Sequence, residues 1–307
     1  MPLMTKLYFL LILALSLNLS AQDDLLAELE ATSLPATEYA FATWKGTKVV
    51  NLQTNEMPGE GVLQYTILHR FGAFNQDFVY NFFGLDNALV RLTLDYSPKD
   101  WLNVGLGHTG FLKTYDAFAK YRLTRQSKGE KNMLVSITGF SSVYYANQKF
   151  NDNLERATNT RFSFVNELII ARKFTPNFSA QIVPTLVHFN LVETPNDNNT
   201  VFALGLAARY KITKMHAITI EYVPQFNANS FPEFGPSGAI TGASDFTNAL
   251  SIGLDIETGG HVFQLFVTNA QGVAEPYVFA QNQGSWLEGD LHFGFNISRV
   301  FTIKKKK

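Results

Sequence analysis

The chain has no cysteine, little charge and no long apolar segment beyond its first residues. Without cysteine it cannot be a disulfide-stapled secreted domain, hold a thiolate metal site or carry a lipid on a terminal cysteine. Charged residues make up 17% of the 307 positions, and 25 basic against 26 acidic residues give no basic surface for a nucleic acid. The mean hydropathy of -0.02 is too low for a bundle of membrane helices.

The first residues have the order of a secretory signal. Lys6 precedes an apolar run over residues 7–17, and small residues then lead to Ala21. The run is about half as long as a membrane-spanning helix must be, so a cleaved signal is favoured over a membrane anchor. We expect residues 1–21 to be removed as a signal peptide. Residues 22–61 are predicted to form a periplasmic lead-in, with a short acidic helix over residues 23–30 and then a mixed segment.

The chain is rich in aromatic residues, with 27 Phe, and 46% of its residues are hydrophobic. From residue 62 onward, apolar and polar positions alternate. A period of two is typical of β-strands with two different faces. Twelve such runs follow one another, at residues 63–68, 90–96, 102–106, 119–123, 133–145, 162–170 and 178–186, around Leu204, Ile220 and Leu254, and at residues 261–268 and 290–303.

The two faces of these runs differ in chemistry. One face is rich in Leu, Ile, Phe and Tyr and nearly free of charge. The other face holds the charged residues that we expect to point into a lumen, namely Arg91, Asp95, Lys120, Arg122, Arg161, Glu167, Arg209, Glu221, Asp255 and Glu257. Pro184, inside one predicted strand, suggests a bulge or kink there.

The connections between the runs alternate strictly in length. Short turns at residues 97–100, 125–131, 175–177, 212–214 and 258–260 separate longer loops rich in Asn, Asp, Gly and Pro. All turns of one kind then lie at one end, as in an outer-membrane barrel with periplasmic turns and external loops. The sequence therefore predicts an all-β fold, a transmembrane up-and-down antiparallel barrel of about 12 strands over residues 62–303. A soluble sandwich is the alternative, but it has no reason to sort its loops in this way.

The last predicted strand is aromatic on one face, with Phe293, Phe295 and Phe301. Outer-membrane barrels commonly finish with such a strand, which the barrel-assembly machinery reads. Outer-membrane lipid and this machinery are therefore the expected partners, and a periplasmic protein that contacts the N-terminal segment is a third. Residues 304–307 are four lysines, which we interpret as a solvated tail.

Four strings in the chain resemble a known family. They are HRFG at residues 69–72, KYRLTRQ at 120–126, PTLVHFN at 184–190 and, most specific, IETGGHVFQLFVTN at 256–269. They are similar to those of an uncharacterised outer-membrane β-barrel family, a domain of unknown function common in Bacteroidetes. The resemblance implies an outer-membrane barrel and supplies no activity, so no functional residue is carried over from it.

The residues themselves give no catalytic or metal motif. HExxH and GxSxG are absent, and the six histidines are dispersed over different runs, so no metal site and no cofactor are predicted. Asp255 and Glu257 share a face and are the one candidate pair of carboxylates, although a salt-bridge network is the favoured interpretation.

The leading hypothesis is a barrel that passes or binds a small solute through a narrow or plugged lumen. Barrels of about eight strands are filled by side chains and those of about sixteen have an open channel, so twelve strands are intermediate. The alternatives are a non-conducting structural or partner-binding barrel, and an outer-membrane enzyme with its site on the lumen or rim. The loop over residues 225–248 is predicted to form a constriction or an external contact.

Overall fold

The computed structural model describes residues 36–75, 77, 79–149, 157–192, 194, 196–234, 240–258 and 261–304. The predicted signal peptide and the predicted acidic helix lie outside these residues. The chain forms two compact units. In the smaller unit, Met1–Tyr39 with Ser127–Asn132, strand β1 (Glu38–Tyr39) pairs with β6 (Ser127–Lys128). The larger unit, Ala40–Gln126 with Met133–Lys307, contains everything described below.

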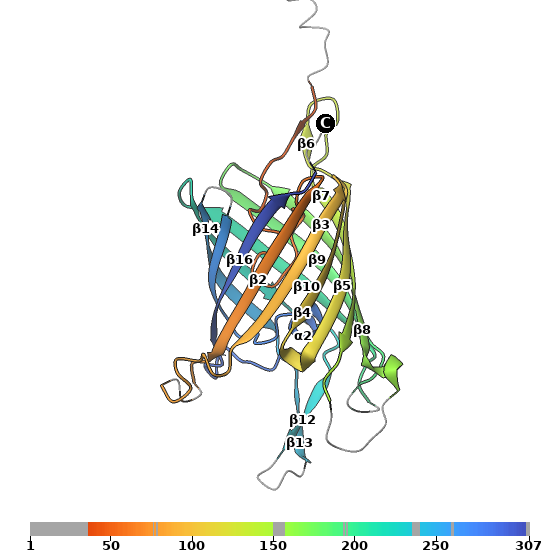
Figure 1. Ribbon diagram of the computed structural model, residues 1–307, viewed down its shortest axis with the longest axis vertical. Helices are drawn as coiled ribbons and strands as arrows, with labels where there is room; N and C mark the ends of the chain where they lie inside the picture. The colour runs from red at the N-terminus through yellow and green to blue at the C-terminus, as the bar shows by residue number, and fades with distance from the viewer. Residues whose placement is uncertain are drawn as a thin grey trace, which may run out of the picture. The chain divides into compact units, whose positions relative to one another are not determined.

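The larger unit is built on a closed barrel of twelve antiparallel strands, which confirms the predicted fold class (Figure 1). Each strand pairs with its neighbours in chain order, and β16 pairs with β2 to close the ring. The strands are β2 (Val62–Ala73), β3 (Leu89–Lys99), β4 (Leu102–Thr109), β5 (Thr114–Thr124), β7 (Ser136–Ala146), β8 (Phe162–Lys173), β9 (Phe178–Phe189), β10 (Thr200–Lys211), β11 (His216–Val223), β14 (Ala249–Thr258), β15 (His261–Thr268) and β16 (His292–Thr302).

The alternation in the sequence is the alternation between the two faces of the wall. On β11, Ile218 and Ile220 are exposed on the outside, whereas Thr219 and Glu221 between and after them are buried inside. This is the pattern of a barrel with an apolar exterior and a polar interior. Among the described residues, no helix combines the length and the apolar character of a membrane span.

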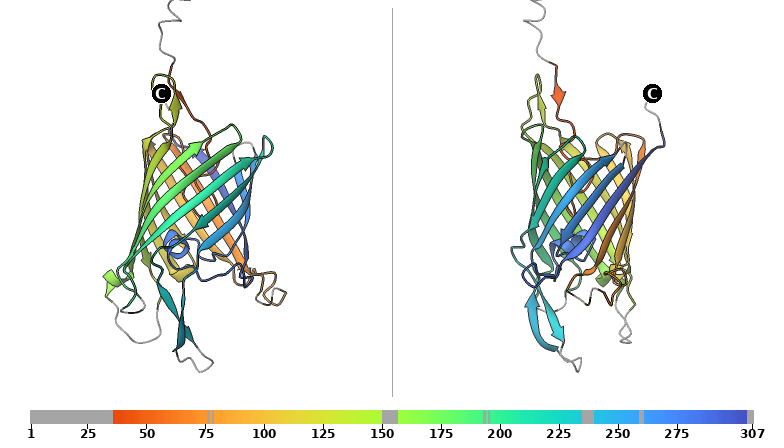
Figure 2. Two further views of the ribbon diagram at one scale, coloured as in Figure 1. Left: turned by 180° about the vertical axis from the view of Figure 1, so that it is seen from behind. Right: turned by 90° about the vertical axis from the view of Figure 1, so that its left-hand side faces the viewer.

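The short turns and the long loops lie at opposite ends of the barrel. We call these the turn end and the loop end. At the loop end are η1 (Phe111–Lys113), η2 (Thr158–Arg161), α2 (Glu275–Phe279) and the hairpin of β12 (Ser230–Phe234) and β13 (Ile240–Asp245). The hairpin projects beyond the barrel strands, whereas α2 lies within the ring of strands (Figure 2). Of the two roles predicted for residues 225–248, the constriction is therefore wrong, because the loop that enters the barrel is the one between β15 and β16, and the external contact stays a prediction.

Pro184 does not produce the predicted bulge. It pairs with Leu204 of β10 in an unbroken register. On the other side, the pairing of β8 with β9 has a gap between Glu167–Thr185 and Ile170–Ile182, with no shift of register across it. The missing N–H of proline thus interrupts one ladder without bending the strand.

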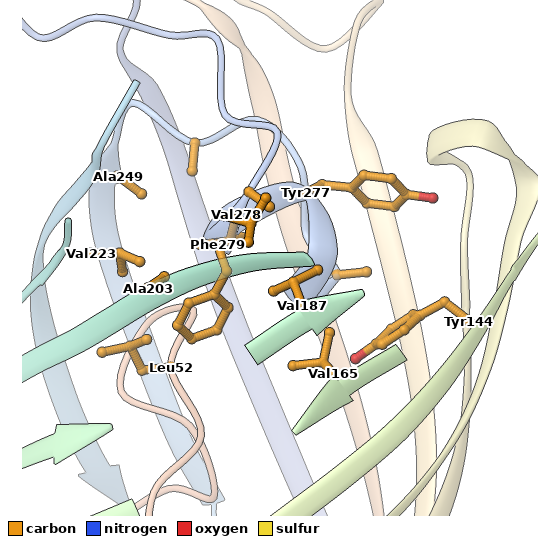
Figure 3. Packing of buried hydrophobic residues seen from close by; sticks show 14 of the residues in the cluster. Leu52, Tyr144, Val165, Val187, Ala203, Val223, Ala249, Tyr277, Val278 and Phe279 are labelled. Atoms are coloured by element: carbon orange, nitrogen blue, oxygen red, sulfur yellow. The ribbon is translucent and has the colours of Figure 1, made fainter. Parts of the chain in front are cut away.

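An apolar cluster fills the barrel interior around α2 (Figure 3). All five residues of α2 are buried, and Phe279 and Val278 pack against wall residues such as Val187 and Ala203. Leu52, from the segment that precedes β2, belongs to the same cluster. The interior is therefore packed by two segments that are not part of the barrel wall.

Candidate functional site

The segment that precedes β2 lies inside the barrel, and we call residues 43–56 the plug. Most of its side chains are buried, with Trp44 2% exposed and Val50 and Leu52 fully buried. The plug forms a narrow hairpin in which Lys48 bridges to Gln53 and the backbone N–H of Thr54 donates to the carbonyl of Thr47 at 3.0 Å. From the sequence, this stretch is predicted only as part of a periplasmic lead-in, and the lumen is predicted to be narrow or plugged.

Both ends of this segment leave the barrel at the turn end. The N–H of Ala40 donates to the carbonyl of Gln126, in the turn after β5, and the N–H of Gly61 donates to that of Ser97, near the turn after β3, both at 2.8 Å. The plug is therefore a hairpin inserted from the turn end, with its tip at residues 50–52.

The tip of the plug wraps around the carboxylate of Glu221 on β11. The backbone N–H groups of Val50, Asn51 and Leu52 donate to its oxygens at 3.0 to 3.2 Å, and the Asn51 amide donates at 2.5 Å. Ser251 Oγ donates to the same carboxylate at 3.0 Å. Successive backbone N–H groups that converge in this way form an anion-binding nest, and here the anion is a side chain of the wall.

Two glycines of the wall give the plug tip its room. A Cβ placed on Gly205 of β10 would lie 2.9 Å from Leu52 Cδ2, and one on Gly253 of β14 would lie 3.2 Å from Val50 Cγ2. At these two positions a larger residue would occupy the space that the tip fills. The wall is therefore shaped to the plug.

Wall side chains also satisfy the carbonyl groups of the plug. Gln264 Nε2 donates to the carbonyls of Lys48 and Val49, at 3.1 and 2.6 Å, and Asn296 Nδ2 donates to that of Val50 at 3.0 Å. Gln181 Nε2 donates to the carbonyl of Gln53 at 2.8 Å. Buried backbone groups need such partners, and the plug obtains them from amides rather than from a β-ladder with the wall.

Glu275, in α2, joins the plug to the opposite wall. It accepts from Lys48 Nζ at 2.6 Å and Gln53 Nε2 at 2.7 Å on the plug, and from Arg91 at 3.0 Å and the Tyr144 hydroxyl at 2.6 Å on the wall. Burial by itself would raise the pKa of Glu275, but the positive charges of Arg91 and Lys48 outweigh it and hold that pKa well below its usual value. The carboxylate is therefore charged in the folded protein.

The charged residues predicted to face the lumen fall into two groups. Arg91, Asp95, Lys120, Glu167, Arg209, Glu221 and Asp255 are buried in the barrel interior. The other three, Arg122, Arg161 and Glu257, lie near strand ends. Arg122 donates to the carbonyl of Asp100 at the turn end, Arg161 donates to loop carbonyls of Ala146 and Gln148, and Glu257 pairs with Lys45 at 2.6 Å.

Most of the interior charges are paired or contact the plug. Lys120 Nζ donates to the carbonyl groups of Thr47 and Glu56 at 3.2 and 3.3 Å. Asp255 accepts from Arg209 at 3.2 Å and from Gln264 at 3.0 Å. In the part of the chain that the structure describes, the carboxylate of Glu167 is buried without a hydrogen-bonding partner. A cavity of about 20 Å³ beside Lys120 and Asp95 has the size of one water molecule.

The predicted lumen-facing residues do not include several residues of this site, among them Arg70, Asp116, Tyr144, Gln264, Glu275 and Asn296. Arg70 donates to Asn51 Oδ1 at 2.7 Å, and Asp116 pairs with Arg91 at 2.8 Å. Arg70 and Asp116 stand at inward positions of strands, where alternation could have marked them. Within the described ranges, no group of three His, Asp or Glu residues is placed to hold a metal ion.

Comparisons with known proteins place the chain among membrane barrels. No protein of curated function matches it. The solved structures that resemble it include the NanC porin (8% identity, TM-score 0.46, 78% of this chain and 98% of that chain) and an outer-membrane channel from Pseudomonas putida F1 (12% identity, TM-score 0.46, 80% and 97%). A further one is the CymD monoaromatic hydrocarbon channel (12% identity, TM-score 0.36, 81% and 90%). The family model described as membrane bound beta barrel domain (DUF5777) matches residues 44–301, which include nearly all of the plug as well as the barrel, and the chain therefore belongs to this family.

Proposed function

We propose that this protein is an outer-membrane barrel that passes a small solute through its lumen, with the plug as the gate. The observation that carries the proposal is the way in which the plug is held. It is a hairpin inserted from one end, fixed by side chains of the wall, and it contributes no strand to the barrel. The plug can therefore leave through the turn end without breaking the ladder of the barrel.

The contacts of the plug support a gate because they are mostly hydrogen bonds and ion pairs. Water can replace such partners when a segment moves, so the free energy that holds the plug is modest compared with the number of contacts. Trp44, Val49 and Leu52 add apolar contacts that favour the closed state. This balance between apolar packing and exchangeable polar contacts suits a segment with two stable positions.

The proposal includes a location and an orientation. The signal at residues 1–21 would export the chain across the inner membrane, and the barrel-assembly machinery would insert it through the aromatic strand β16. The turn end would then face the periplasm, where a periplasmic protein could act on the segment that leads into the plug. The exposed leucines and isoleucines of the wall would contact outer-membrane lipid.

A second candidate is a barrel that never conducts, and one observation favours it. Glu275 holds plug and wall together through fully buried charges, and removal of one partner from such a network is strongly destabilising. An enzymatic function has less support, because Asp255 and Glu257 are each held in an ion pair with Arg209 and Lys45. We therefore propose no catalytic role for this pair.

A reversible lock of the plug tests the gate. Because the chain has no cysteine, Val50→Cys with Gly253→Cys gives the only two thiols, on the plug tip and on the wall position that it touches. The folded variant in a planar bilayer is expected to show no current steps when oxidised and to show steps after reduction. The Val50→Cys single variant should respond to neither treatment.

Deletion of residues 43–56 separates the two candidates. A gated barrel without its plug should conduct continuously, provided that the purified variant still migrates as a folded barrel without heating. A folded plug-deleted barrel that carries no current at any voltage would contradict the plug as the gate and favour the non-conducting candidate. Equal current from the oxidised and the reduced lock would contradict the plug as the gate.

A further inference from the structure

The loop end of the barrel contains two adjoining cavities, which together we call the vestibule. Their volumes are about 820 and 310 Å³, within or near the usual range of ligand pockets. Both cavities are lined by Phe111, Phe231, Gln281 and Gln283. The vestibule lies between η1, the β12–β13 hairpin and the loop that follows α2.

Two aromatic side chains form fixed walls of the vestibule. Phe111 packs edge-on against Tyr277 of α2, with ring centroids 4.7 Å apart, and Phe231 packs against Phe246 at 5.2 Å. Each ring is thus held by a contact with a second aromatic ring, and Phe246 itself lines the larger cavity.

The backbone beside Phe111 is strained. Leu112 and Lys113 follow one another in the left-handed region, with φ of 49° and 50°, although neither is a glycine. Such strained residues cluster at functional sites such as ligand clamps, where the strain holds a side chain in place. The strain at Leu112 and Lys113 is therefore consistent with a role in presenting Phe111 and Leu112, which both line the larger cavity.

The polar groups that the vestibule offers are neutral. Within the described chain, the carboxamides of Gln271, Gln281 and Gln283 make no hydrogen bond. The titratable groups that line the same cavities are engaged elsewhere. Glu233 accepts from the Ser244 hydroxyl, and Asp290 accepts from Asn75 Nδ2 at 2.6 Å and the Ser285 N–H at 3.0 Å. His292 Nδ1 donates to the carbonyl of Phe71 at 2.9 Å.

We propose that the vestibule binds a neutral saccharide. Each carboxamide has a hydrogen-bond donor and an acceptor at its end, and a sugar hydroxyl is likewise both a donor and an acceptor. A carboxamide can therefore bond to a hydroxyl through either its N–H₂ group or its carbonyl oxygen. The faces of Phe111 and Phe231 suit the C–H faces of a sugar ring. An anionic ligand would find no lysine or arginine in the lining, and a purely apolar ligand would bury three carboxamides without partners.

The proposal names the class of solute for the proposed channel. Passage of the sugar through the barrel rests on the proposed function, whereas binding in the vestibule does not. Binding is therefore measured separately from conductance. Isothermal titration of the folded protein in detergent with maltotriose and with cellotriose is the test, with sialyllactose as a charged sugar of similar size and p-cresol as a small aromatic. We expect at least one neutral trisaccharide to bind, and both comparison ligands to bind at least tenfold more weakly.

Variants of the vestibule carry matched controls. Phe231→Ala and Gln281→Leu are each expected to weaken trisaccharide binding by about tenfold, as the loss of one good contact does. Phe226→Ala and Gln148→Leu, at loop positions that do not line either cavity, should leave binding unchanged.

Three results would overturn the assignment. They are no binding of either neutral trisaccharide, tighter binding of sialyllactose or p-cresol, and equal effects of the vestibule and the control variants. The oxidised plug lock should still bind the sugar, because the vestibule lies outside the plug. Sugar binding by a barrel that never conducts would contradict the channel alone and leave the vestibule assignment standing.

Discussion

Glu221 on the barrel wall and Asn51 at the tip of the plug are joined through both the backbone and the side chain of the asparagine. The N–H of Asn51 lies 3.0 Å from each carboxylate oxygen, and its amide Nδ2 lies 2.5 Å from Oε1. The residues are 170 positions apart in the chain. One carboxylate thus fixes the far end of a segment whose two ends are both at the turn end, and it does so with charge-assisted hydrogen bonds.

Glu221→Gln should loosen the plug. The amide keeps one acceptor but loses the charge and turns an N–H₂ group toward the backbone donors of the tip. Charge-assisted hydrogen bonds contribute about 1.5–3 kcal/mol, so we expect the ratio of released to seated plug to rise by roughly tenfold to a hundredfold. Acrylamide quenching of Trp44, which is 2% exposed, measures release in a background with Trp101→Phe and Trp286→Phe.

The control for Glu221→Gln is Glu60→Gln, which removes an exposed ion pair with Lys99 at 3.5 Å. Exposed pairs contribute about 0–1 kcal/mol, so quenching of Trp44 should stay near that of the parent. Equal quenching in the two variants would show that the Glu221 carboxylate does not hold the plug.

Gly205→Ala should displace the plug by contact alone. The added Cβ would lie 2.9 Å from Leu52 Cδ2 and 3.1 Å from Val183 Cβ, and overpacking of this kind costs about 1–3 kcal/mol. Trp44 should become easier to quench, and Leu52→Ala in the same chain should restore part of the protection by making room.

Gly110→Ala is the matched control, because its added Cβ would meet no atom closer than 4.0 Å. The plug should then stay seated. If Gly110→Ala releases Trp44 as much as Gly205→Ala does, or if Leu52→Ala gives no rescue, the close approach at Gly205 does not position the plug.

The barrel could be predicted from the sequence, and the plug could not. Each strand of the wall has one face toward lipid and one toward the interior, so apolar and polar residues alternate along it. On β3, for example, Arg91 is buried inside and its neighbour Leu92 is exposed outside. The plug has no period, because Val50, Asn51 and Leu52 bind Glu221 through backbone N–H groups that every residue type has. Helix α2 has five residues, too few for a helical stripe, and Glu275 therefore left no signal of its role.

The contribution of Glu275 to holding the plug should be lost only at strongly acidic pH. The pKa of Glu275 is lowered in the folded protein by Arg91 and Lys48, which outweigh the effect of burial. A carboxyl group with a lowered folded pKa contributes stability that is fully present above its unfolded pKa, about 4.3, and is lost as the pH falls through the lower folded value. The part of the protection of Trp44 that depends on Glu275 should therefore be constant from pH 8 to about pH 5 and decline only below the unfolded pKa.

Glu275→Gln separates this group from the other interior carboxylates. Acrylamide should quench Trp44 more easily in the variant at pH 7, because Lys48 and Arg91 lose a buried counter-charge. The quenching of Trp44 should also depend less on acid in the variant than in the parent. An unchanged acid dependence in Glu275→Gln would assign the titration to another carboxylate, and a difference between parent and variant that disappears between pH 8 and pH 6 would contradict the lowered pKa.

Leu106→Arg should destabilise the barrel through its outer face. Leu106 is 65% exposed on β4 and pairs with Leu94 of β3, in the middle of an apolar surface that would face lipid. An arginine on the lipid face of a barrel costs about 2–4 kcal/mol near the midplane of the bilayer. Leu287→Arg makes the same exchange at a fully exposed loop residue, where it should change the free energy of unfolding by less than about 0.5 kcal/mol. Urea unfolding of both variants in lipid vesicles compares them directly, and equal losses would mean that the outer face of β4 does not contact the hydrocarbon core of the bilayer.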